Sequence, residues 1–198
     1  GSGGPNFALL LGDGSGALAG IEDVVTAPSP NGVAVGDLNN DGLSDIAVGQ
    51  NDGHLRLYHA RATGGFAAPQ VLAADGSATV TKLADFNGDD RLDLLVLDAD
   101  AQSVALRLAQ VDGTFAAPEY YTVGTGATSL AIGDWNIDGR LDFAVARQGN
   151  ELTGIVELRV AAASGGFVAQ GTVPVNLTPV AIAPGDFNND SVPDLAVA

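Results

Sequence analysis

The phrase GDLNNDGLSDIAV fills residues 36–48 of this 198-residue chain and returns three more times in related form. The other copies are ADFNGDDRLDLLV at residues 84–96, GDWNIDGRLDFAV at 133–145 and GDFNNDSVPDLAV at 185–197. The first Asp of successive copies lies 48, 49 and 52 residues apart. Such a period is typical of a unit of four β-strands. The chain is therefore predicted to consist of four structural repeats.

Short apolar segments rich in β-branched residues surround each phrase and predict strands. A first strand leads into the phrase at residues 33–35, 80–83, 130–132 and 180–182, and a second leaves it at 46–48, 94–97, 143–145 and 195–197. A third strand follows at 55–57, 106–108 and 158–160. Residues 9–11 near the N-terminus are predicted to be another third strand, because they stand in the same relation to the residues that follow them. FAAP segments at 66–69 and 115–118 lead into a fourth. Because helical periodicity is absent, we expect an all-β propeller of four-stranded blades.

The order of strands leaves half a unit at each end of the chain. The chain begins with third and fourth strands and ends with first and second strands. We expect residues 195–197 to pair with residues 7–11 and close a ring of four blades, which would hide the sheet edges. The alternative is that the units belong to a larger ring. Residues 1–4 read as a flexible start, and residues 5–198 as a single propeller domain.

Each aspartate-rich loop offers oxygen atoms at alternate positions, as a calcium site requires. We count the first Asp of each phrase as position one. The side chains at positions one, three, five and nine would bind the ion, and so would the backbone carbonyl at position seven. We therefore expect up to four calcium ions. The predicted ligands are Asp37, Asn39, Asp41, Leu43 and Asp45; Asp85, Asn87, Asp89, Arg91 and Asp93; Asp134, Asn136, Asp138, Arg140 and Asp142; and Asp186, Asn188, Asp190, Val192 and Asp194.

The loops are not EF-hands, because position twelve is Val where that motif carries a bidentate Glu, and no helices flank them. Position six needs a residue that tolerates positive φ. Gly42 and Gly139 adopt it freely, Asp90 tolerates it, and Ser191 is less suited to it. The fourth loop also has Pro193 at position eight. We expect the first and third sites to be the strongest and the fourth to be the weakest.

The alternative for each loop is a set of Asx-turns, in which Asp and Asn bond their own backbone and bind no metal. Twelve Asp side chains are confined to the four loops, three in each at positions one, five and nine. Close like charges repel and raise their own pKa values, so a cation is needed to neutralise them. Four copies in register favour the metal interpretation.

Loops of the form DxNxDGxxD with flanking strands and FAAP segments resemble the FG-GAP/VCBS repeats of integrin-alpha-type β-propellers. The resemblance covers nearly the whole chain after Gly4. It implies a calcium ion in each blade's loop, an extracellular or cell-surface location, and a role in adhesion, lectin-like binding or as an accessory domain. Members of the family commonly have about seven blades, so four units are a departure.

Composition limits the partners. Eight Lys and Arg face 24 acidic residues, which gives a net charge of −16 and argues against nucleic acid and anionic membranes. Four acidic residues are Glu, which leaves 20 Asp, the residue suited to turns and hard cations. The chain has no Cys and no apolar run of the roughly 18 residues that span a bilayer. The expected partners are calcium and a carbohydrate or extracellular protein, with a homo-oligomer as a further possibility.

Other residues were weighed as catalytic or binding groups. Paired carboxylates serve glycosidases, but every cluster here belongs to the repeated motif, so we expect no enzyme. His54 and His59 favour surface strand positions over catalysis, and the Gly-rich segments at 12–16 and 124–126 favour turns.

Three recurring side-chain types are expected to be structural. Arg56, Arg107 and Arg159 share one repeat position and are expected to brace a neighbouring carboxylate. The residues at loop position two are expected in the core between blades; they are Leu38, Phe86, Trp135 and Phe187. Tyr120 and Tyr121 are adjacent on a strand, so one should face outward as a candidate for stacking on a ligand.

Three functions fit these observations. The first is a non-enzymatic adhesion or lectin-like module. The second is an accessory domain of a secreted polysaccharide-acting enzyme. The third is a structural ring, engineered or excised, with no ligand but calcium.

Overall fold

The computed structural model describes residues 6–25, 29–74, 76–149, 153–176 and 178–198. Every regular element in these ranges is a β-strand, which confirms the all-β prediction. The predicted flexible start at residues 1–4 lies outside the described residues.

The strands form three complete four-stranded antiparallel sheets and two hairpins. Each sheet keeps its strands in chain order, so every connection joins neighbours. The sheets are β3 (Pro30–Gly36), β4 (Asp45–Gln50), β5 (His54–Tyr58) and β6 (Gln70–Ala73); β7 (Ala78–Ala84), β8 (Asp93–Asp98), β9 (Ser103–Arg107) and β10 (Glu119–Thr122); and β11 (Ala127–Gly133), β12 (Asp142–Gln148), β13 (Gly154–Ala161) and β14 (Phe167–Val175). We call these sheets blades one, two and three.

The two hairpins are the half-units predicted at the ends of the chain. They are β1 (Asn6–Gly12) with β2 (Leu18–Val25), and β15 (Ile182–Gly185) with β16 (Asp194–Val197). The predicted strand order is therefore confirmed. Two boundaries differ: the third strand expected at residues 106–108 ends at Arg107, and the first strand of the last unit, expected at 180–182, begins at Ile182. The amides of Val180 and Ala181 still donate to the carbonyl of Ala198, at 2.7 and 3.2 Å.

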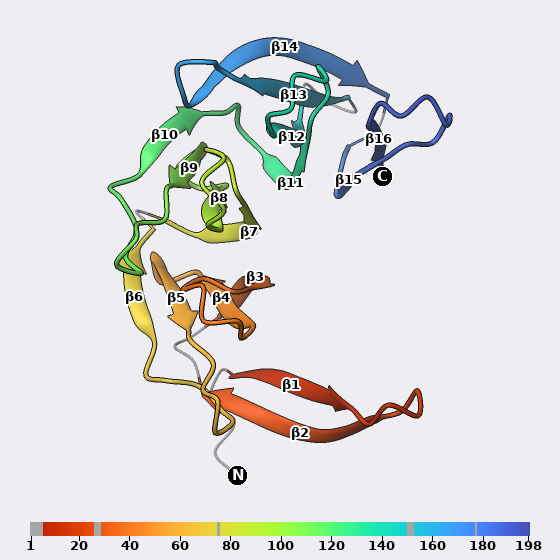
Figure 1. Ribbon diagram of the computed structural model, residues 1–198. Helices are drawn as coiled ribbons and strands as arrows, with labels where there is room; N and C mark the ends of the chain where they lie inside the picture. The colour runs from red at the N-terminus through yellow and green to blue at the C-terminus, as the bar shows by residue number, and fades with distance from the viewer. Residues whose placement is uncertain (1–5, 26–28, 75, 150–152, 177) are drawn as a thin grey trace.

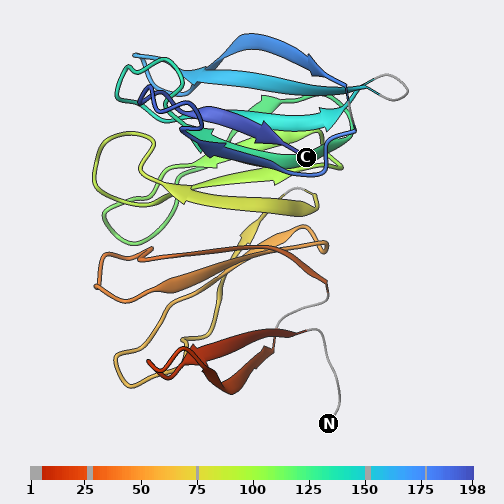
Figure 2. The same cartoon turned by 90° about the vertical axis from the view of Figure 1, so that its right-hand side faces the viewer.

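The sheets follow one another in a curved row, as the blades of a propeller do (Figure 1). The first strand of each unit lies on the inner side of the curve, where β3 contacts β7, β7 contacts β11 and β11 contacts β15. The last strands β6, β10 and β14 lie on the outer side. Figure 2 shows that the loops between first and second strands gather on one side of the molecule.

The predicted closure of the ring is not found within the chain. Among the described strands β1 pairs only with β2, and β16 pairs only with β15. Figure 1 places the two hairpins at opposite ends of an open arc, so residues 195–197 do not pair with residues 7–11. The four units form an open arc rather than a closed circle (Figure 1). The larger ring stays a prediction.

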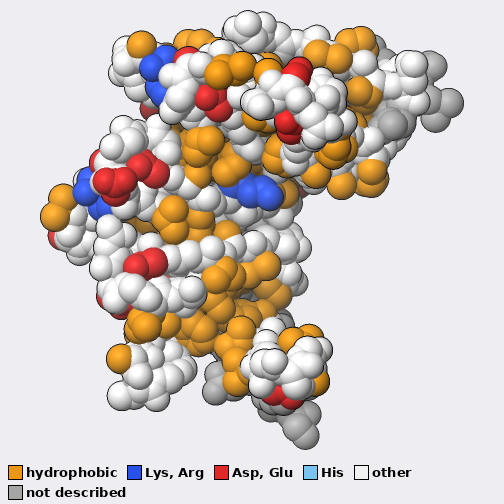
Figure 3. Space-filling view, turned by 45° about the vertical axis from the view of Figure 1, so that its right-hand side comes forward, with side chains coloured by type: hydrophobic (Ala, Val, Ile, Leu, Met, Phe, Trp, Pro, Cys, Tyr) orange, Lys and Arg blue, Asp and Glu red, His pale blue; other side chains and the backbone are white. Residues whose placement is uncertain are grey.

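The open arc leaves apolar side chains uncovered. Val33 and Val35 on β3 are 62% and 63% exposed, because the first hairpin covers only the outer part of blade one. Phe187 in the last loop is 63% exposed. Figure 3 shows hydrophobic side chains gathered along the inner side of the arc.

The core lies between the sheets. The second strands β4 and β8 are buried along their whole length because a neighbouring sheet covers each face. Leu55 and Leu57 of blade one pack with Leu94 and Val96 of blade two. Phe143 of blade three packs in one cluster with residues of blade two.

The side chains at loop position two enter these interfaces as predicted. Leu38 packs against blade two, Phe86 against blade three, and Trp135 against the last hairpin. The rings of Phe86 and Phe167 lie 5.7 Å apart, edge to face. Phe187 occupies the same position but is exposed, which contradicts its predicted place in the core, because no further sheet follows it among the described residues.

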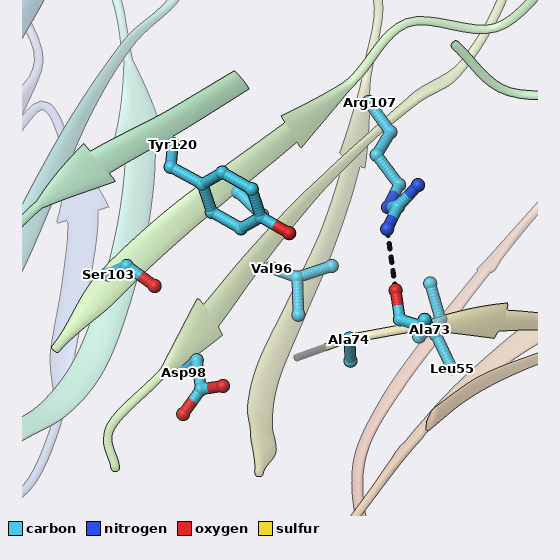
Figure 4. A pocket seen from close by; sticks show the side chains of 9 residues that line it. Leu55, Ala73, Ala74, Val96, Asp98, Ser103, Arg107 and Tyr120 are labelled. Carbon is cyan, nitrogen blue, oxygen red and sulfur yellow. Dashed lines mark hydrogen bonds between the residues drawn. The ribbon is translucent and has the colours of Figure 1, made fainter. Parts of the chain in front are cut away.

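The recurring arginines join neighbouring blades. The guanidinium of Arg107 on β9 donates to the carbonyl of Ala73 at the end of β6, 2.5 Å away (Figure 4). Arg159 donates likewise to the carbonyl of Thr122 in blade two. Arg56 instead pairs with Asp52 of its own blade at 3.0 Å. The bracing interpretation holds: Arg56 pairs with Asp52, and Arg159 pairs with Glu157 of its own blade at 3.1 Å. Arg107 and Arg159 in addition reach a backbone carbonyl of the preceding blade.

We expect Arg107→Ala to lower the free energy of unfolding by about 2 kcal/mol, because it leaves the Ala73 carbonyl without its charged donor. Urea denaturation monitored by tryptophan fluorescence measures this loss. The matched control is Arg56→Ala, which breaks a pair within one blade and should cost less than about 1 kcal/mol. Equal losses in the two variants would contradict an inter-blade role for Arg107.

Candidate metal centre

The four predicted loops join the first and second strands of successive units, and all lie on the same side of the arc (Figure 2). Acidic side chains stand in separate groups on this side in the space-filling view (Figure 3). In each loop a strand ends, the chain turns through the Asp-rich phrase, and the next strand begins at position nine. The repeat therefore places the same polar groups at the same end of every unit.

The carboxylate at position one organises the loop backbone. In the first loop, Asp37 Oδ1 accepts the amide of Asp41 at 3.1 Å, and Asp37 Oδ2 accepts the amide of Gly42 at 2.7 Å. The other three loops repeat both hydrogen bonds, at 3.1–3.2 Å and 2.8–2.9 Å. These are the local bonds expected of Asx-turns. A metal ion would have to use the second lone pair of each oxygen.

Positions three and five add a second layer to the same turn. Asn39 Oδ1 accepts the amide of Asp41 at 3.0 Å, and Asn39 Nδ2 donates to Asp41 Oδ2 at 3.0 Å. Asp41 Oδ1 accepts the amide of Leu43 at 2.8 Å. The equivalent bonds recur in the other loops. The side-chain oxygens at positions one, three and five thus accept hydrogen bonds from the amides of positions five, six and seven.

Two positions of each loop take up positive φ. Position six does so as predicted, with φ of 84° at Gly42, 63° at Asp90, 81° at Gly139 and 67° at Ser191. Position four does so as well, which the sequence interpretation missed; its residues are Asn40, Gly88, Ile137 and Asn189. Asn and Gly are frequent in this region, and their presence in three copies was the available signal. Ile137, at φ 56°, is β-branched and therefore strained.

The fourth loop is not distorted. Ser191 and Pro193 were expected to disturb its geometry, yet its hydrogen bonds match those of the other loops in partners and length. That geometric reason for a weak fourth site is therefore wrong. The order of affinities stays a prediction.

The carboxylate at position nine has a structural role that the sequence did not reveal. Asp45 is fully buried, and its Oδ2 accepts the amide of Leu38 at 3.0 Å while its Oδ1 accepts the amide of Ala60 at 2.7 Å. Asp93 and Asp142 form the same two bonds, to Phe86 and Ala109 and to Trp135 and Ala161. Each of these carboxylates fastens its loop to the end of the third strand. Asp194 bonds only Phe187, at 3.0 Å, because no third strand follows it in the described chain.

The three carboxylates of a loop repel one another. Burial raises the pKa of Asp93, and the charges of Asp89 and Asp85 raise it further, against the two amides that lower it. The pKa of Asp142 is raised in the same way, by burial and then by Asp138 and Asp134. Desolvation opposes ionisation at Asp85 as well, but four backbone amides outweigh it and lower its pKa. Each of these loops therefore carries an excess of negative charge that a cation would relieve.

The residues fit a hard divalent cation by the chemistry of their donors. Every side chain predicted to bind is a carboxylate or amide, and the carbonyl at position seven is a further oxygen. Among the described residues, however, no group of three or more His, Asp or Glu side chains stands in a metal-holding arrangement. The loops are thus chemically suited to calcium but would have to draw their carboxylates closer together around the ion.

Position seven differs among the loops. Arg91 and Arg140 were selected for their backbone carbonyls, but their guanidinium groups pair with the position-five carboxylates Asp89 and Asp138. The side chains of Leu43 and Val192 at this position carry no charge. This difference was readable in the sequence and was missed.

The structure also places His59 and the tyrosine pair Tyr120 and Tyr121. His59 is not a simple strand residue, since it lies past the end of β5 and its Nδ1 is 2.9 Å from Asp45 Oδ2. Tyr121 is buried and Tyr120 is 46% exposed, as their alternation predicted. Tyr120 borders the hollow of Figure 4, whose volume of about 10 Å³ suits one water molecule.

Comparisons with known proteins agree with this architecture. A family model described as FG-GAP-like repeat matches residues 37–96, 85–145 and 134–197. No curated protein matches the chain. Among 27 matching chains of solved structures is the crystal structure of BBS1N in complex with ARL6DN, soaked with lead, with a TM-score of 0.56 and 15% identity. The match covers 87% of this chain and 52% of that one, so this chain spans about half its length. At this identity the likeness shows the fold alone.

No helix in the described part of the chain is long and apolar enough to cross a membrane.

We expect Asp142→Asn to lower the free energy of unfolding by about 1–3 kcal/mol in metal-free buffer, because one of its two buried amide partners loses its acceptor. Urea denaturation in EGTA measures the change. Asp194→Asn is the matched control and should cost less, since Asp194 has one amide partner and is only partly buried. A loss at Asp142 that is seen only when calcium is present would rule out the structural role.

We expect Ile137→Asn to raise the free energy of unfolding by about 1 kcal/mol, because Asn tolerates positive φ where a β-branched residue is strained. Ile137 is 65% exposed, so little packing is lost. Thermal denaturation followed by circular dichroism checks the gain. Ile137→Val keeps the branching and should bring no gain; if it stabilises equally, strain at this residue is not the cause.

Proposed function

The chain belongs to the FG-GAP-like repeat family, and on that premise we propose that it is a calcium-binding β-propeller module for adhesion or lectin-like recognition outside the cell. The observation that carries the proposal is that the four loops share the same donors and the same backbone hydrogen bonds. Each presents the same oxygen donors, held by the same hydrogen bonds, around carboxylates at positions one, five and nine. The buried carboxylate at position nine joins the loop to the third strand. The carboxylates at positions one and five accept backbone amides of their own loop, and their shared negative charge is what a bound cation would offset.

Charge supports a cation as that explanation. Among the described residues no Lys or Arg forms an ion pair with the carboxylates of the first and fourth loops. Calcium brings two positive charges and accepts six to eight oxygen ligands in flexible geometry. Backbone amides fix the position-one carboxylate, which lowers the cost of ordering the loop when the ion binds. The ligands would be the side chains at positions one, three, five and nine and the carbonyl at seven.

The expected affinity supports a location outside the cell. The loops lack the bidentate Glu that helps EF-hands reach high affinity, and extracellular calcium modules bind at roughly 10⁻⁴–10⁻³ M. Such sites fill in extracellular calcium, whereas the far lower cytosolic concentration would leave them empty. The proposed setting is therefore secreted or on the cell surface.

The proposed role is recognition rather than catalysis. The clustered carboxylates recur in every unit, as expected of structural or metal-binding groups. Tyr120 offers an exposed ring on the outer strand β10, suited to stacking on a sugar. A carbohydrate or an extracellular protein is the proposed ligand class.

The alternatives are an accessory domain of a secreted polysaccharide-acting enzyme and a structural ring with calcium only. A glycan array probed with the chain in calcium, beside the same array in EGTA, separates them from recognition. Calcium-dependent binding that Tyr120→Ala weakens supports recognition. Polysaccharide binding without selectivity among glycans favours the accessory role, and no binding favours the structural one.

We expect calcium to raise the melting midpoint, because an ion that binds the folded loops better than the unfolded chain stabilises the fold. At ten times Kd one site adds roughly 1.4 kcal/mol, and each kcal/mol raises the midpoint by about 2–4 °C in a chain of this size. Differential scanning fluorimetry in calcium and in EGTA measures the difference, and Asp41→Ala should reduce it.

Asp13→Ala is the control, because Asp13 makes similar local bonds to Ser15 in the β1–β2 turn but stands outside the four loops. This variant should keep the full calcium effect. An identical midpoint in millimolar calcium and in EGTA, with no binding heat, would refute the calcium proposal.

A further inference from the structure

Two of the four loops carry an internal cation next to their carboxylates. The Nη2 of Arg140 lies 2.7 Å from Asp138 Oδ2 in the third loop, and Arg91 pairs with Asp89 in the second. In both loops the Arg is at position seven and the Asp at position five, so the contact is a repeated feature. The same Asp accepts the Arg backbone amide on its other oxygen, at 3.0 Å in each loop.

The first and fourth loops provide the natural comparison. Their backbone bonds equal those of the second and third, but position seven is Leu43 or Val192. The third loop therefore differs from the first chiefly in one positive charge at position seven. In the second loop the charge of Arg91 is accompanied by the negative charge of Asp90 at position six. The guanidinium occupies the position-five oxygen that faces away from the backbone amides.

We propose that Arg91 and Arg140 act as built-in counter-ions that compete with calcium, so that the second and third loops bind it more weakly than the first. The inference rests on the proposed calcium function and refines it. A guanidinium beside Asp138 relieves part of the repulsion that calcium would otherwise relieve. On calcium binding it must either leave its carboxylate or stay near a doubly charged ion. Both outcomes weaken binding.

The structure leaves each arginine a place to move. Arg140 borders a hollow of about 180 Å³ formed with Phe86 and Asn87 of the preceding loop and the turn before β14. Arg91 borders a hollow of about 230 Å³ formed with Leu38 and Asn39 of the first loop. The side chains of Arg91 and Arg140 are 29% and 43% exposed. A calcium ion can thus displace them without disturbing the packed core.

This arrangement assigns calcium dependence to different parts of the arc. The loops of blades two and three, at its centre, are partly neutralised by their own arginines. The loops of blade one and the last hairpin have no arginine at position seven. Among the described residues, the only basic side chain near a carboxylate of the first loop is the imidazole of His59, 2.9 Å from Asp45, so on this proposal both loops depend more on the metal. The inference also reverses the expectation for the third loop, which position six alone ranked among the strongest.

The backbone amide resonances of Gly42 and Gly139 allow calcium binding to be followed separately in the first and third loops. Each donates its amide to the position-one carboxylate, so calcium in a loop will shift the resonance of that amide. The experiment titrates calcium into the full ¹⁵N-labelled chain, prepared in EGTA, and follows both glycines by NMR. The variants are Arg140→Leu, Arg140→Lys and Leu43→Arg.

In the unaltered chain we expect Gly42 to respond at about tenfold lower calcium than Gly139. Arg140→Leu should lower the Gly139 midpoint by about tenfold and leave Gly42 unchanged, and Leu43→Arg should raise the Gly42 midpoint. Arg140→Lys keeps the charge and should keep the Gly139 midpoint within about threefold of the original. Unperturbed resonances in β3 and β4 show that each variant remains folded.

A Gly139 midpoint that stays the same or rises in Arg140→Leu, while calcium still shifts the resonance, overturns the inference and leaves the calcium function intact. Silence of both glycines up to about 10 mM calcium refutes the calcium function, and this inference with it. A second measurement uses stability instead of a resonance. Arg140→Leu should lower the melting midpoint in EGTA more than in calcium; the reverse also counts against the inference.

Discussion

The buried carboxylate at position nine is the interaction on which each complete blade depends. Asp45, Asp93 and Asp142 each accept one amide from the loop and one from the end of the third strand. A short carboxylate can reach both because it stands where the second strand begins. It thereby fixes the loop relative to the sheet, and the loop then directs its position-two side chain into the neighbouring interface. A buried charge is costly unless it is bonded in this way.

Packing between blades follows from that fixed geometry. The position-two side chains of the first three loops reach the next sheet, and the arginines at the third-strand position reach back to the previous one. The two interfaces between complete blades are therefore held near the loop end by apolar contact and near the outer strand by a charged hydrogen bond. The exposed Phe187 and the single bond of Asp194 show what is missing where no further sheet follows.

The acidic side chains of each loop have two different roles. Position nine fixes the loop to the third strand, whereas positions one and five order the loop backbone and bring two more negative charges close together. In the second and third loops an arginine side chain at position seven offsets part of this charge. In the proposed function a bound cation offsets the rest, so one side chain at position seven would set how much each loop depends on metal.

The local unit could be predicted from the amino-acid sequence alone: the strands, the loop between them, the positive φ at position six and the half-units at the ends. These could be predicted because nearly all bonds of the loop join residues within five positions of one another, so that spacing alone encodes them. Which distant groups meet became clear only from the three-dimensional arrangement. The bond from Asp45 to Ala60 joins residues 15 positions apart in one blade, and the bond from Arg107 to Ala73 joins two blades. The open arc depends on how the sheets pack against one another, through contacts spread over each interface that no short motif specifies.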